Sequence, residues 1–62
     1  MTDKERMLLM CGHYRLQMDI DKQYEGLELT TDTRSREYME SVIEACKFTQ
    51  KKISEMLRKD ND

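Results

Sequence analysis

Proline is absent from this chain of 62 residues, and glycine occurs only twice, as Gly12 and Gly26. Because these two residue types interrupt regular structure most often, their scarcity favours long helices. Tryptophan is also absent, whereas methionine occurs six times, which indicates an apolar surface that adapts easily in shape. A chain this short forms one domain at most and buries only about 60% of the surface that its unfolded form exposes. We therefore expect the chain to be stabilised by association with another protein chain.

Two cysteines, Cys11 and Cys46, permit a single disulfide, which is too few for the cross-linking typical of small secreted folds. The longest apolar run covers residues 7–11, far below the ~18 residues that a membrane span needs. The net charge of −2, with 39% charged residues of mixed sign, provides no general attraction to nucleic acid. We expect a cytoplasmic protein that does not contact membranes.

The first helix is predicted over about residues 3–25. Thr2 and Glu5 have the spacing of a capping box, in which each side chain bonds the backbone amide of the other residue. Gly26 can adopt the left-handed conformation that commonly ends a helix.

The second helix is predicted over about residues 32–59, after a connection at residues 26–31. Its first free amides can be capped by Thr31, Asp32 or Thr33. Because the connection is short, the two helices should lie antiparallel. The sequence thus predicts an all-α chain with one helical-hairpin domain over residues 1–62.

Apolar residues form one stripe on the second helix and two on the first. The stripe on the second helix follows the alternating spacing of a coiled-coil seam and consists of Met39, Val42, Cys46, Thr49, Ile53 and Met56. On the first helix, the leucine stripe is Leu9, Leu16, Ile20 and Leu27, and the methionine stripe is Met7, Cys11, Tyr14 and Met18. The second helix can cover only one of them. We therefore predict a homodimer, in which two hairpins form a four-helix bundle.

The position of the turn decides which stripe packs inside the hairpin. A turn centred between Glu28 and Leu29 places Cys11 level with Cys46. The same register pairs Met18 with Met39 and Asp21 with Arg36. On this basis the methionine stripe is predicted to contact the second helix, and the leucine stripe (Leu9, Leu16, Ile20 and Leu27) is predicted to be the dimer interface.

No combination of residues predicts catalysis or cofactor binding. The chain has no phosphate-binding glycine loop, no nucleophile elbow and no His–acid pair beside a serine. Cys11 and His13 lie two residues apart, so they point to different sides of a helix and cannot share a metal with Cys46. We expect a non-enzyme without catalytic, cofactor-binding or metal-binding residues.

Candidate residues for binding a second protein lie on the second helix. Phe48 points away from its apolar stripe, and is either partly buried beside Leu9 or an anchor for a partner. Arg34 and Arg36 occupy the first turn, where positive charge opposes the helix dipole. We expect compensation from the acidic end of the first helix (Asp19, Asp21 and Glu25) or from an acidic partner.

The favoured function is a small cytoplasmic regulator, an inhibitor or adaptor of the kind that phages and mobile elements encode, which binds a second protein as a homodimer. An alternative is a structural subunit of a larger complex. The predicted bundle is also similar in shape and length to the plasmid RNA-binding protein Rop. Nucleic-acid binding is less favoured, because the stretch from Glu44 to Asp60 holds five basic and three acidic residues, a net charge of only +2.

Overall fold

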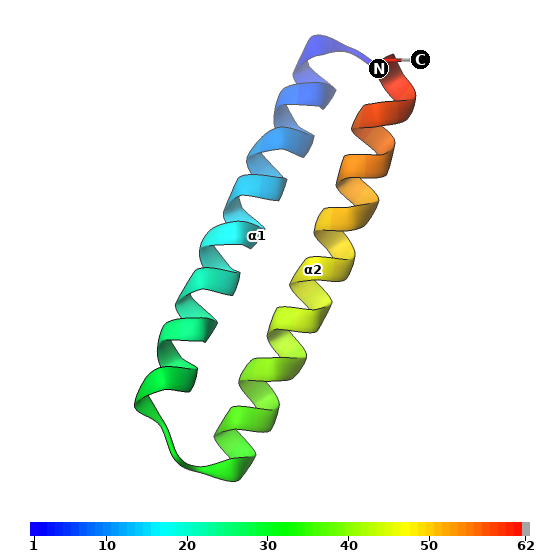
Figure 1. Ribbon diagram of the computed structural model, residues 1–62. Helices are drawn as coiled ribbons and strands as arrows, with labels where there is room; N and C mark the ends of the chain where they lie inside the picture. The colour runs from blue at the N-terminus through cyan, green and yellow to red at the C-terminus, as the bar shows by residue number, and fades with distance from the viewer. Residues whose placement is uncertain (62) are drawn as a thin grey trace.

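The computed structural model describes residues 1–61 as two long helices folded into a hairpin (Figure 1). Helix α1 spans Asp3–Leu29, helix α2 spans Thr33–Asn61, and residues 30–32 connect them. The helices run antiparallel, so the start of α1 and the end of α2 lie together at the end opposite the turn (Figure 1). The hairpin is a rod whose extents are 45 × 14 × 11 Å. For the described residues, the all-α hairpin prediction is confirmed.

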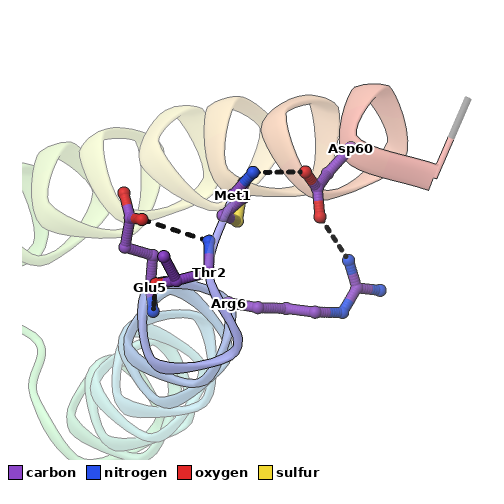
Figure 2. Close-up of polar contacts among 5 residues, drawn as sticks. All are labelled: Met1, Thr2, Glu5, Arg6 and Asp60. Atoms are coloured by element: carbon purple, nitrogen blue, oxygen red, sulfur yellow. Dashed lines mark hydrogen bonds and ion pairs between the residues drawn. The ribbon is translucent and has the colours of Figure 1, made fainter.

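The capping box at the start of α1 is present. The Glu5 amide donates to Thr2 Oγ1 at 3.1 Å, and the Thr2 amide donates to Glu5 Oε1 at 3.1 Å (Figure 2). These bonds to Thr2 lower the pKa of the Glu5 carboxyl below its ordinary value of 4.5. Two amides that the first turn would leave unpaired are thereby satisfied.

Helix α1 continues past Gly26 and ends four residues later than predicted, at Leu29 instead of residue 25. Neither glycine adopts a positive φ, and the Thr30 amide donates to the Gly26 carbonyl at 3.1 Å. The prediction that Gly26 ends the helix was therefore wrong. The extra turn is stabilised because Leu27 packs against the core.

Helix α2 begins after Asp32, one of the three capping residues considered above. The Ser35 amide and Ser35 Oγ both donate to Asp32 Oδ2, at 2.9 and 2.7 Å. These bonds to Ser35 lower the pKa of the Asp32 carboxyl below its ordinary value of 3.8. A carboxylate at this position also suits the positive end of the helix dipole.

The later turn changes which residues of the two helices lie side by side. Because the connection occupies residues 30–32, each residue of α1 lies beside a later residue of α2 than predicted. A Cβ added at Gly12 would lie 3.8 Å from Ile53, although the predicted register placed Gly12 level with residue 45. Cys46 packs in a cluster with Ile20, while Cys11 is exposed. The predicted pairing of Cys11 with Cys46 was wrong.

The shifted register also reverses the assignment of the two stripes of α1. The buried core consists of Ile20, Ile43 and Cys46, and Leu16, Leu27 and Val42 pack around it. Leu9 is half-buried and shares an open hollow with Met56 of α2. The leucine stripe therefore packs against α2, where it was predicted to bind a second copy. The methionine stripe, predicted to contact α2, is exposed, and Tyr14 reaches 73% exposure.

Replacing Gly12 with alanine should stabilise the hairpin by about 1 kcal/mol, the difference in helix propensity between the two residues. The added methyl group would make an ordinary contact, 3.8 Å from Ile53 Cδ1. Gly26→Ala should stabilise less, because its methyl group would lie 3.0 Å from Met39 Sδ and Cε, which must then move. Urea denaturation of both variants measures the difference. A Gly12→Ala variant that is less stable than wild type would contradict the close but unstrained packing at this position.

Stability should fall as the pH is lowered through the acidic range. The pKa values of Glu5 and Asp32 are lowered in the folded chain. The unfolded chain therefore binds protons more readily, and the stabilisation present above about pH 4.5 is lost as the pH falls through the folded-state pKa values.

Thermal melts of wild type and Asp32→Asn from about pH 6 to about pH 3 test this expectation. Asparagine still caps a helix but has no carboxyl to titrate, so Asp32→Asn should lose less stability on acidification than wild type. Ser35→Ala, which removes the Oγ donor to Asp32, should give an intermediate pH dependence. If stability fell equally with pH in all three proteins, the Asp32 carboxyl would not be a source of the pH dependence.

Candidate interaction surfaces

The residues with metal-ligating chemistry are dispersed over the hairpin. Cys46 is buried in the core, and Cys11 is exposed on α1. His13 is half-buried, and its carbonyl accepts a hydrogen bond from Gln50 Nε2 at 3.2 Å. Within residues 1–61 no group of three or more His, Cys, Asp or Glu side chains is arranged to hold a metal ion.

Over the same described residues, neither helix is long and apolar enough to span a membrane.

The methionine stripe forms an apolar surface along the amino-terminal half of α1. Its members recur at spacings of four, three and four residues. Since the leucine stripe lies about half a turn away and faces α2, the methionine stripe lies on the side of α1 opposite α2. Two further exposed apolar side chains, Leu8 and Met10, flank it. The hairpin itself leaves this surface uncovered.

Phe48 lies on the outer side of α2, with 64% of its surface exposed. The Lys52 ammonium lies 5.4 Å from the centroid of its ring, and it also lies 3.8 Å from the Glu55 carboxylate. Of the two interpretations of Phe48, burial beside Leu9 is not what the structure shows. The exposed ring and the Lys52 ammonium instead form a cation–π contact at the surface of α2.

Arg34 and Arg36, both predicted to bind a partner, have different environments. Arg34 is exposed, whereas Arg36 is half-buried. Arg36 Nη1 donates to the Leu27 carbonyl at 2.6 Å and to the Thr30 carbonyl at 3.2 Å. The last turn of α1 has no basic residue of its own, so Arg36 supplies positive charge to its negative end. Arg36 therefore bonds the end of its own hairpin. Within residues 1–61 no hydrogen bond or ion pair joins it to Asp19, Asp21 or Glu25, so the predicted acidic compensation is not observed.

A second group of polar contacts joins the two helices along their length. Lys47 Nζ donates to Tyr24 Oη at 2.9 Å and lies 5.5 Å from the centroid of the Tyr24 ring. Gln50 Nε2 donates to Gln17 Oε1 at 3.0 Å. Two of the basic residues that could have contacted phosphate, Lys47 and Lys52, are thus engaged with aromatic rings of the same chain.

At the open end of the hairpin, the Asp60 carboxylate joins the two helices. It lies 3.1 Å from the amino group of Met1 and 3.4 Å from Arg6 Nη1 (Figure 2). These ion pairs are partly exposed, and such pairs contribute about 0–1 kcal/mol each.

No protein-family model, curated protein or solved structure matches this chain.

Proposed function

We propose that this protein is a small regulator that acts by binding other protein chains. It pairs with a second copy through α1 and contacts a different protein through α2. It acts in the cytoplasm, where Cys11 and Cys46 remain reduced, and it has no catalytic activity of its own.

The observation that carries the proposal is the imbalance between buried and exposed apolar side chains. Among the residues whose burial the structure describes, three form the core, namely Ile20, Ile43 and Cys46. The methionine stripe, by contrast, forms a contiguous exposed surface on one side of α1. Scattered exposed apolar residues are common, but contiguous patches of this kind mark interaction sites. A small chain that has neither a disulfide nor a large core gains stability most readily by association.

Helix α2 presents different chemistry on its outer side. At about 3.6 residues per turn, Arg34, Phe48 and Lys52 lie on the same side of α2, and all three are exposed. Arginine and aromatic residues contribute most strongly to binding at protein interfaces. This surface suits a partner that offers an apolar pocket for Phe48 and an acidic group for Arg34.

Tagged wild-type protein and Phe48→Ala should be compared in capture experiments from the cell of origin. Phe48→Ala should lose the second protein but still associate with itself. Leu29→Ala, which truncates an exposed apolar side chain on α1, should behave as wild type. The activity of the captured protein should change when the purified regulator is added. A chain that stays monomeric, and captures no protein in a Phe48-dependent way, would contradict the proposal. A fixed-stoichiometry complex without any change in activity would instead identify a structural subunit.

A further inference from the structure

We propose that the second copy binds the methionine stripe with the two α1 helices antiparallel, the twofold axis passing between Gly12 and His13. This inference rests on the self-association in the proposed function and adds its surface and orientation. It also replaces the leucine stripe as the dimer contact, since that stripe packs against α2.

The spacing of the methionine stripe is that of a coiled-coil seam. The same three- and four-residue spacing extends the stripe to Lys4 at one end and Asp21 at the other. Both charged residues are exposed, and Asp21 Oδ1 accepts a hydrogen bond from Gln17 on the same helix at 3.0 Å. From Lys4 to Asp21 the seam covers about 26 Å of helix, at about 1.5 Å per residue.

An antiparallel pair matches every layer of this seam. Met7 faces Met18 of the second copy, and Cys11 faces Tyr14 of the second copy, so a small side chain opposes a large one. The outermost layers place Lys4 opposite Asp21 of the second copy. The twofold axis makes each of these contacts occur twice. The seam therefore has four apolar layers in the middle and one oppositely charged pair at each end.

A parallel pair lacks this complementarity. It would place Lys4 against Lys4 and Asp21 against Asp21, so both ends of the seam would repel. Tyr14 would also oppose Tyr14, and Cys11 would oppose Cys11, which pairs large with large and small with small. The charges therefore select the antiparallel orientation, as oppositely charged positions do in coiled coils generally.

The antiparallel pair also leaves the second surface free. Because the methionine stripe lies on the side of α1 opposite α2, the two α1 helices are central and the two α2 helices are outermost. Phe48 and Arg34 remain exposed on both outer helices. One dimer can then bind a different protein through α2 while its two copies stay paired through α1.

Sedimentation equilibrium of wild type, Lys4→Glu, Asp21→Lys and the double variant tests the orientation. Each single change creates two repelling layers in the antiparallel dimer and should raise the dimer Kd by about tenfold. The double variant restores opposite charges and should return to within about twofold of wild type. Lys51→Glu, the same charge change on α2, should leave the Kd unchanged, and circular dichroism should show that all variants remain helical.

Disulfide trapping tests the same orientation independently. Met7→Cys and Met18→Cys are each made with Cys11→Ser, and the two proteins are mixed and oxidised. The antiparallel pair predicts a disulfide mainly between the two different variants. Efficient cross-linking of either variant with itself would overturn the orientation.

The outcomes separate this inference from the proposed function. If wild type dimerises but the charge variants all match it, the antiparallel seam is wrong while self-association stands. If wild type is monomeric at every concentration, both the seam and the proposed self-association are overturned.

Discussion

Replacing Ile20 with alanine is expected to lower the free energy of unfolding by about 3 kcal/mol. Ile20 is the most buried residue of the core, with 2% of its surface exposed, and it packs with Ile43 and Cys46 between the two helices. Truncation to alanine removes buried methyl and methylene groups and leaves a cavity that the helices can only partly close. In a hairpin with so small a core, we expect this loss to unfold a large fraction of the chain.

Leu29→Ala is the matched control for this change. Leu29 lies on the same helix but is 87% exposed, so its truncation should change the unfolding free energy by no more than about 0.5 kcal/mol. Denaturant titration monitored by circular dichroism, at one protein concentration for all variants, measures both changes. If Ile20→Ala and Leu29→Ala lowered the free energy of unfolding equally, the leucine stripe would not pack against α2 as described.

Several features of the fold were predictable because local chemistry determines them. The absence of proline and the scarcity of glycine favour long helices. The capping box at Thr2 and Glu5 defines the start of α1, and Asp32 caps α2 from a position that the sequence indicates. These contacts join residues three positions apart, so no tertiary information is needed to expect them.

The end of α1 was not predictable in the same way, because a distant contact decides it. Gly26 permits a helix to end but does not require it. The extra turn is held by Leu27, which packs against the core, and by Arg36, which binds carbonyls of the turn. Because the turn was predicted a few residues too early, every predicted pairing between the two helices was displaced. The prediction of which stripe of α1 faces α2 depended on those pairings.

The candidate surfaces were predicted only in part, because the leucine stripe, predicted as the dimer interface, packs against α2. The pattern of α2 correctly placed Phe48 outside the contact between the helices. It could not distinguish Arg34 from Arg36, because both occupy the first turn and only the position of the end of α1 separates their roles. The predicted last turn, residues 22–25, contains Lys22. The lack of a basic residue in the observed last turn therefore became visible only once the end of α1 was known.

Replacing Arg36 with alanine is expected to lower the free energy of unfolding by about 2 kcal/mol, a typical loss for hydrogen bonds from a charged group. The change removes both bonds from Arg36 Nη1, to the Leu27 and Thr30 carbonyls. It also removes a positive charge from the negative end of α1. We therefore expect α1 to fray back towards Gly26, where its intrinsic signal for ending lies.

Arg34→Ala is the control, since Arg34 is exposed in the same turn of α2 and its loss should change stability by less than about 0.5 kcal/mol. Arg36→Lys should retain part of the stability, because an ammonium keeps the charge but lacks the planar fork of the guanidinium. Thermal melts rank the variants, and amide hydrogen exchange at Leu29 and Thr30 should accelerate in Arg36→Ala alone. Equal effects of Arg34→Ala and Arg36→Ala would mean that charge near the turn, rather than the bonds from Arg36, stabilises the end of α1.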